Sequence, residues 1–286
     1  MKRQHQEVQT PSWQDMNPSI LSKIFSFLGV EDQLFGPPFV CQSWLSATLD
    51  TLFQNSKLDL RLMDRLDDKN LRFRFTHLLK LAINLYHGWV SIYFPSKHRL
   101  GYFATLYIAE RTPRITSVVL PPQVCANMIP IFISALYWKN LRLFQARMNP
   151  DLGFLVISQL VDCCKNITEL RIHGTVVMER EVSCIIEGFP RIQILDLSEC
   201  VSSCGALEIA LDGRLGWLKE LNLLHCKFMG DDGKDIREDY LKLKEFRNKV
   251  LEKASGFTSL KKLRHCLVKV CPDCRDHGSL DPENLP

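Results

Sequence analysis

Apolar residues recur with a period close to 26 residues through the middle of the chain. The pattern apolar-x-x-apolar-x-apolar, where x is any residue, occurs five times, and its copies start 26, 26, 25 and 26 residues apart. Its fifteen apolar positions are Ile115, Val118, Leu120, Leu141, Phe144, Ala146, Ile167, Leu170, Ile172, Ile192, Leu195, Leu197, Leu218, Leu221 and Leu223. Because unrelated sequence rarely holds such a register five times, the pattern indicates an internal repeat.

Each copy follows a stretch in which apolar residues are spaced three and four apart, which predicts a helix. These stretches cover residues 100–111, 126–138, 152–164, 179–187 and 204–211. One short strand and one helix cannot enclose an apolar core alone, but stacked parallel copies form a continuous one. The sequence therefore predicts an α/β leucine-rich-repeat solenoid, with short parallel strands on the concave side and helices on the convex side.

Two weaker copies of the pattern flank the five. The first begins at Leu78, 37 residues before Ile115, and leaves an irregular insertion at about 86–98. The second begins at Leu260 and has a histidine, His265, at its last position. We expect both copies to extend the solenoid.

A charged segment at about 234–253 has helical apolar spacing and is predicted to cap the solenoid, because a terminal repeat needs a polar outer face. The residues after it are rich in Pro, Asp and Gly, which is typical of disorder. The predicted division of the chain is a disordered N-terminus at 1–12, a helical module at 13–53, the solenoid at 54–266 and a disordered tail at 267–286.

The N-terminal module does not share the repeat. Asn17 and Pro18 are typical of the start of a helix, and an apolar face follows at Ile20, Leu21, Ile24, Phe25 and Leu28. After two prolines at 37 and 38, a second apolar helix carries Phe39, Val40, Trp44, Leu45 and Leu49. About forty residues cannot enclose so many large apolar side chains, so part of this surface should contact the repeats and part another protein.

The module and the first repeat together resemble a known family. The module resembles the three-helix F-box of plant proteins at Trp13, Asp15, Met16, Ile20, Leu21, Lys23, Ile24, Phe25, Leu28, Val40, Cys41 and Trp44. The stretch from Phe103 to Pro113, leading into Ile115, is similar to the first regular repeat of plant F-box/leucine-rich-repeat proteins. The resemblance covers about 13–226, and the chain departs from the family's usual proline and acidic residue at Asn17 and Ser19.

The resemblance implies a function without a catalytic group. In this family the F-box binds a Skp-type adaptor carried on a cullin–RING scaffold, and the repeats hold a target protein near the ubiquitin-charged enzyme. The chain would be the substrate-recognition subunit of such an SCF-type E3 ubiquitin ligase, acting by proximity and orientation. The adaptor-facing residues carried over from the family are Pro18, Ile20, Leu21, Ile24, Val40 and Trp44, although several of them could instead form the core of the module.

The expected target site is the concave face. Residues between the template positions should line this face in two rows, one at Val119, Gln145, Arg171, Asp196 and Asn222 and the next at Pro121, Arg147, His173, Ser198 and Leu224. The candidate target-binding residues are Gln145, Arg147, Arg171, His173, Asp196 and Asn222. The alternative is an ordinary solvated face, with the target bound by loops.

Composition and charge exclude or disfavour several other classes of protein function. The net charge of +4 on 286 residues, without a basic stripe, gives little support to nucleic-acid binding, and no apolar run is long enough for a membrane span. Eleven cysteines behind a polar N-terminus predict free thiols in the cytoplasm or nucleus. Cys266, Cys271, Cys274 and His277 could hold zinc, but incidental thiols in a tail are the simpler interpretation, so no metal or cofactor is expected.

Two rival functions stay open beside the ligase subunit. One is a leucine-rich-repeat scaffold without ligase association, whose N-terminal helices only cap the solenoid. The other is a zinc- or thiol-dependent activity in the C-terminal tail.

Overall fold

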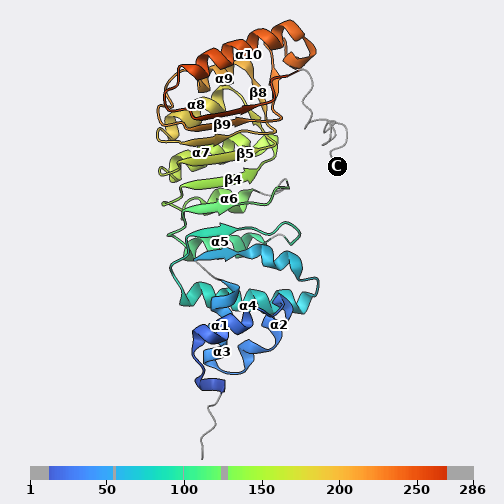
Figure 1. Cartoon of the computed structure of the whole chain (residues 1–286), viewed down its shortest axis with the longest axis vertical. Helices are drawn as coiled ribbons and strands as arrows, with labels where there is room; N and C mark the ends of the chain where they lie inside the picture. Colours follow the sequence, from blue (N-terminus) through green and yellow to red (C-terminus); the bar gives the residue numbers. More distant parts are fainter. Residues whose placement is uncertain (1–12, 54–55, 99, 124–127, 269–286) are drawn as a thin grey trace, which may run out of the picture.

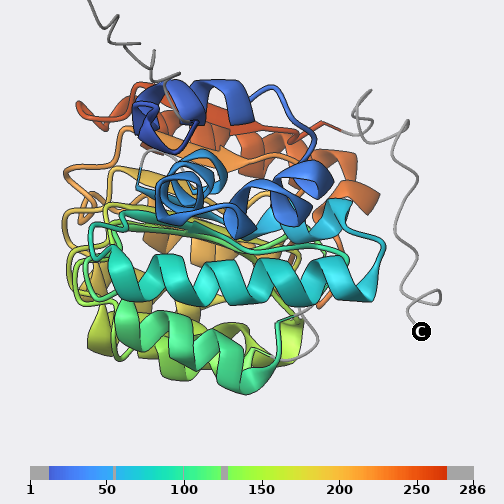
Figure 2. The same ribbon diagram turned by 90° about the horizontal axis from the view of Figure 1, so that it is seen from below.

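The computed structural model describes residues 13–53, 56–98, 100–123 and 128–268. Figure 1 shows an elongated stack of strands and helices, with the N-terminal helices at one end and helix α10 (Tyr240–Ser255) at the other. The predicted fold class is confirmed: the strands pair in parallel, and helices of successive repeats lie on one side of them. Figure 2 looks down the long axis of the stack from its N-terminal end and shows helices of the repeats on one side.

The main sheet of the described part of the chain has eight parallel strands. In sheet order they are β1 (Lys57–Asp59), β2 (Ser91–Tyr93), β3 (Ser117–Val119), β4 (Leu143–Arg147), β5 (Glu169–His173), β7 (Ile194–Asp196), β9 (Glu220–Leu223) and β11 (Lys262–His265). The sheet register follows the repeat, because Val118 pairs with Phe144 and the next partners are Leu170, Leu195 and Leu221. All five are completely buried, so the middle template position forms the centre of the core.

Helices cover the other side of the core. They are α4 (Lys69–Leu85), α5 (Tyr102–Arg111), α6 (Ile129–Ser134), α7 (Gly153–Cys163), α8 (Glu179–Gly188) and α9 (Cys204–Ala210). A smaller parallel sheet joins β6 (Val176–Val177), β8 (Val201–Ser203) and β10 (Lys227–Met229). Short 3-10 helices complete the chain: η1 (Trp13–Asp15), η2 (Pro37–Phe39), η3 (Leu60–Arg65), η4 (Pro150–Leu152) and η5 (Ile236–Glu238).

The strand expected at Leu78 is part of a helix instead. Leu78 lies inside α4, whose N-cap Asp68 accepts hydrogen bonds from the backbone of Asn70 and Leu71. The repeat continues at Trp89, Ile92 and Phe94, which match Ile115, Val118 and Leu120 at a spacing of 26 residues and are all buried. The expected irregular insertion at about 86–98 therefore contains the regular strand β2.

The C-terminal end of the stack has a helix over its core, as a cap requires. Helix α10 begins at Tyr240, later than the expected start near residue 234, because the side chain of Asp239 accepts hydrogen bonds from the first turn. Its buried residues are Leu243, Phe246 and Val250, while its other faces are mainly charged and exposed. After α10, β11 extends the main sheet, and Leu267 is still buried. The tail expected to be disordered begins at residue 267, but Leu267 and Val268 are described, and Leu267 belongs to the core. Residues 1–12 and 269–286, the rest of the expected disorder, lie outside the described residues.

The N-terminal module consists of α1 (Pro18–Phe25), α2 (Val30–Phe35), η2 and α3 (Gln42–Leu52). Asn17 caps α1, because its side chain accepts a hydrogen bond of 2.9 Å from the Ser19 backbone. The module has two cores. One is a small separate cluster of Leu21, Phe25 and Ala47, against which Met16 and Trp44 pack, and the other is continuous with the core of the repeats.

Candidate interaction sites

Helix α1 separates its apolar residues onto two faces. Leu21 and Phe25 are buried on one face, whereas Ile20 is 53% exposed and Ile24 is 41% exposed on the other. Residues four apart share a face of a helix, so each pair forms one continuous strip. Neither Ile20 nor Ile24 is among the described residues that form the two cores, and their strip is the first element of a candidate docking surface.

Leu21 does not lie on that surface, contrary to the expectation. Its side chain is only 1% exposed and packs in the small core of the module. Trp44 also serves this core in part: its ring lies 5.1 Å from that of Phe25, and its indole N–H donates a hydrogen bond to the carbonyl of Trp13. Leu21 is therefore a supporting residue, and Trp44 offers only part of its surface to a partner.

The exposed apolar surface of the module is larger than the motif residues alone indicate. Pro18 and Val40 are exposed as expected. Exposed large apolar side chains that the motif does not single out as contacts are Trp13, Phe27, Leu28, Phe35 and Phe39. Of 24 exposed large apolar residues among the described ones, eight lie between residues 13 and 40, so the module carries a third of them.

The guanidinium of Arg74, on α4, stacks against two of these aromatic rings. It lies 4.4 Å from the ring centre of Phe35 and 5.1 Å from that of Phe39, and Phe73 beside it is exposed. Such contacts are favourable because the face of an aromatic ring attracts a cation. The exposed apolar surface of the module thus reaches the first repeat helix. A sequence motif limited to residues 13–53 does not reveal this continuation.

The remaining side of the module is fixed to the repeats. Leu34, Leu49, Leu52 and Phe53 belong to the large core, and the Phe53 ring meets that of Trp89 edge to face at 6.1 Å. The module therefore uses one side to join the solenoid and leaves the other side uncovered.

The expected first row of the concave face is present. Sheet register places Val119 beside Gln145, Gln145 beside Arg171, Arg171 beside Asp196, and Asp196 beside Asn222. In the second row Arg147 pairs with His173. The candidate target-binding residues are half-buried, except Asn222, which is buried.

Asp196 is the centre of a hydrogen-bond network on this face. Its carboxylate accepts 3.0 Å hydrogen bonds from the Ser198 backbone and the Asn222 side chain, and Nε2 of His173 lies 3.5 Å away. Burial raises the pKa of Asp196, but its contacts with His173, Ser198 and Asn222 outweigh burial and hold the pKa well below the usual range. Asp196 and Asn222 therefore mainly satisfy each other, which leaves them little capacity to bind a target.

The arginines of the concave face are paired as well. Arg171 forms an ion pair with Glu169 from the same strand, and Arg147 pairs with Glu199. The C-terminal half of the face is thus a balanced polar surface, whereas Val119 and Gln145 are uncharged. This arrangement favours a protein partner over a polyanion.

Potential metal ligands are dispersed among the described residues. These hold no cluster of three or more His, Cys, Asp or Glu side chains that could hold a metal ion. Of the cysteines expected near the C-terminus, Cys266 is buried, whereas Cys271, Cys274 and His277 lie outside the described residues. None of the described helices has the length and apolar character of a membrane span.

One known protein is similar to this chain along nearly the whole length of both. The chain is similar to an F-box/LRR-repeat protein of Arabidopsis thaliana, with 25% identity over 292 residues that cover 96% of this chain and 91% of the relative. Among solved structures it is similar to an internalin of Listeria monocytogenes, with 12% identity and a TM-score of 0.41, over 78% of this chain and 62% of the internalin. No family model matches the chain. The expected resemblance to plant F-box/leucine-rich-repeat proteins is confirmed by the first of these similarities.

Proposed function

We propose that this chain, similar to an F-box/LRR-repeat protein, is the substrate-recognition subunit of an SCF-type E3 ubiquitin ligase. The N-terminal module would bind a Skp-type adaptor, and through it a cullin–RING scaffold. The repeats would bind the target protein. The chain would supply no bond-making group. It would act by holding the target close to the ubiquitin-charged enzyme, which raises the effective concentration of the target there.

The uncovered apolar surface of the module carries this proposal. Its candidate contact residues are Pro18, Ile20, Ile24 and Val40, with the exposed part of Trp44 beside them. A fully buried side chain of this kind contributes about 1.5–3 kcal/mol relative to an exposed one. Several such side chains in one place are therefore typical of a surface that a partner covers.

The rigid connection between the module and the repeats supports the second half of the proposal. Leu34, Leu52 and Phe53 belong to the same core as the strands. A target on the concave face would then keep a fixed position relative to the adaptor, which proximity-based transfer requires.

We also propose that the chain acts in the cytoplasm or nucleus. The eight cysteines of the described residues are all free thiols, four of them buried. Reducing compartments maintain such thiols. Imaging of a tagged full-length chain would test this location.

A pull-down with the full chain tests the adaptor contact. The purified chain should retain a purified plant Skp-type adaptor, and Ile20→Asp combined with Ile24→Asp should abolish retention, because two charges would have to be buried in an apolar interface. Leu155→Asp is the matched control, since Leu155 is 46% exposed on α7 of the repeats. The control should retain the adaptor.

Two results would contradict the ligase subunit. The first is failure of the unmodified chain to retain the adaptor, or a cullin when the adaptor is present. The second is capture of a cullin that is unaffected by the paired Ile20 and Ile24 substitutions. A scaffold without ligase association predicts the first of these results.

A further inference from the structure

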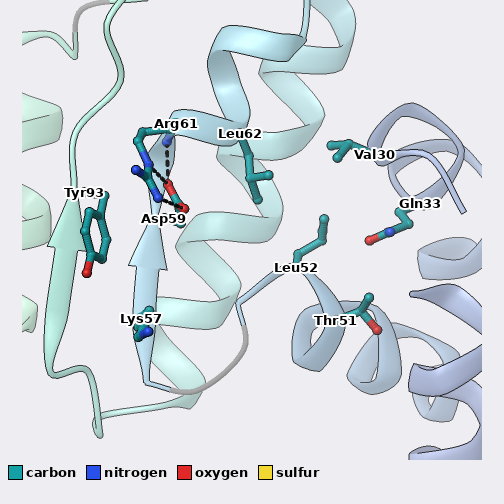
Figure 3. A pocket seen from close by; sticks show the side chains of 9 residues that line it. All are labelled: Val30, Gln33, Thr51, Leu52, Lys57, Asp59, Arg61, Leu62 and Tyr93. Atoms are coloured by element: carbon teal, nitrogen blue, oxygen red, sulfur yellow. Dashed lines mark hydrogen bonds and ion pairs between the residues drawn. The ribbon is translucent and has the colours of Figure 1, made fainter. Parts of the chain in front are cut away.

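A pocket of about 380 Å³ lies where the N-terminal module meets the first strands. Figure 3 shows its two walls: Val30, Gln33, Thr51 and Leu52 come from α2 and α3, and the strand side contributes the remaining lining residues. Those are Lys57, Asp59, Arg61, Leu62 and Tyr93. The volume lies within the range of ligand-binding clefts. Neither the family motif nor the repeat period accounts for this pocket.

The pocket is continuous with the concave face. Asp59 pairs with Tyr93 in the sheet register, and Tyr93 pairs with Val119, the first residue of the expected concave row. The next residue of the row is Gln145. Because Val119 and Gln145 carry no charge, an extended chain could leave the pocket along this face without meeting an electrostatic barrier.

Cationic groups dominate the strand side of the pocket. Asp59 binds Arg61 through two hydrogen bonds, from Nε at 2.8 Å and from Nη2 at 2.6 Å, and the guanidinium stacks on the Tyr93 ring at 4.6 Å. These contacts fix the orientation of Arg61 and leave its Nη1 hydrogens for a ligand. Lys57 forms no ion pair with any described residue. The lining residues therefore carry one uncompensated positive charge.

The opposite wall offers an unused hydrogen-bond acceptor. Gln33 is only 6% exposed, and its amide nitrogen donates a 3.0 Å hydrogen bond to the Leu28 carbonyl. Its amide oxygen is buried and accepts no hydrogen bond from any described residue, and in Figure 3 the amide points toward Leu52. A buried acceptor without a donor is costly, so a ligand that supplies an N–H would stabilise this wall.

We infer that this pocket anchors an acidic residue of an extended segment of the target protein. The carboxylate would lie between Lys57 and Arg61, its aliphatic stem against Leu52 and Leu62, and a neighbouring backbone N–H would donate to Gln33. The inference rests on the proposed function for the identity of the occupant. The charged side chains in the C-terminal half of the concave face are paired with one another. The target would therefore bind most strongly at the junction between the module and the first strands, not at that half of the face.

Peptide pools give a direct test with the full chain and no adaptor. Three pools of end-blocked, fluorescein-labelled heptapeptides would have Glu, Gln or phosphoserine at the centre, with random Gly, Ala and Ser on both sides. Fluorescence polarisation should show that the Glu pool binds roughly threefold more tightly than the Gln pool, the size expected of one partly exposed ion pair. Lys57→Met and Arg61→Met should each remove this preference. Lys262→Met, at the far end of the sheet, should leave it intact.

The buried acceptor is tested separately. Gln33→Met keeps the size of the side chain but removes its oxygen, so both the Glu and the Gln pools should bind more weakly while their ratio stays the same. An unchanged affinity would overturn the role of Gln33.

Three results would overturn the carboxylate site: no binding of any pool, no preference for Glu over Gln, or a preference limited to phosphoserine. Loss of the preference in Lys262→Met but not in Lys57→Met would move the site away from the junction. Because the adaptor is absent from this assay, its failure leaves the adaptor pull-down unaffected. Failure of the pull-down with a persisting Glu preference would reject only the ligase function.

Discussion

Arg147 reaches across a whole repeat to Glu199: its Nη1 atom lies 2.5 Å from Oε2 of the glutamate, although strand β5 lies between the two. The arginine side chain passes over Gly174. A Cβ atom on that glycine would lie 3.0 Å from Nε and 3.2 Å from Cγ of Arg147. Gly174, Glu199 and His225 occupy equivalent repeat positions, and all three have a positive φ of 61–67°. The position that lies under Arg147 is the one with a glycine.

Gly174→Ala should lower the free energy of unfolding by about 1–3 kcal/mol, because it combines a left-handed backbone with a close contact to Arg147. Urea unfolding measures this loss. In an Arg147→Ala background the same substitution should cost less, since the crowded neighbour is then absent. An equal cost in both backgrounds would show that the contact with Arg147 is unimportant. Gly216→Ala, where nothing lies within 4 Å of the added Cβ, should change stability by less than about 0.5 kcal/mol.

Asp196 should make stability depend on pH in the acidic range. Its pKa in the folded chain is well below the usual value, so its stabilising contribution is fully present above about pH 5 and is lost as the pH falls toward the folded-state pKa. At pH 7, Asp196→Asn should be about 1–3 kcal/mol less stable than the unmodified chain, because the substitution removes the charge of the acceptor and so weakens the hydrogen bonds that it receives. Urea unfolding at pH 7, 5 and 3.5 should show this difference shrinking as the pH falls.

The control for this pH series is Asp212→Asn, which removes an exposed ion pair with Arg214. Exposed pairs contribute little, so this variant should follow the unmodified chain closely at every pH. A constant difference between Asp196→Asn and the unmodified chain from pH 7 to 3.5 would contradict the role of the charged Asp196 network.

The buried cysteines should resist alkylation until the chain unfolds. Burial raises the pKa of the Cys164 and Cys200 thiols to about 12 and that of Cys226 well above its ordinary value, and the thiolate is the reactive form. Iodoacetamide at pH 8 followed by peptide mass spectrometry should label Cys41, which is half-buried, before these three. Rapid labelling of Cys200 in the folded chain would contradict this packing.

The five central repeats are predictable because each template position fills the same place in the core. The first repeat is harder to recognise. Leu78, Leu81 and Ile83 satisfy the strand template, but the same spacing suits a helix, and in α4 Leu78 and Ile83 are buried while Leu81 is exposed. Spacing alone cannot distinguish these cases. The correct copy at Trp89 keeps the 26-residue period, so the period identifies this repeat where a match to the apolar template alone does not.

The docking surface and the junction pocket were less accessible to sequence reasoning. Motif matching identifies apolar residues of α1 but does not tell which face turns inward, because Leu21 and Ile24 are both apolar and only packing against Ala47 separates them. The pocket joins Gln33 to Arg61 across an interface between two elements. No local pattern records such a contact, since its members share neither a helix face nor a strand.

Leu21→Ala and Ile24→Ala should therefore affect different properties of the module: Leu21→Ala its stability, and Ile24→Ala its binding to the adaptor. Leu21 fills the small core, so its truncation should cost about 2–5 kcal/mol of local stability and speed hydrogen exchange throughout α1. Ile24 is exposed, so its truncation should leave exchange in α1 unchanged and instead weaken retention of the adaptor. Hydrogen-exchange mass spectrometry on the full chain, alongside the pull-down, separates the two outcomes. Two results would contradict this assignment: faster exchange in α1 of Ile24→Ala, or unchanged exchange in α1 of Leu21→Ala. Either result would indicate that Ile24, and not Leu21, packs against Ala47 in the folded chain.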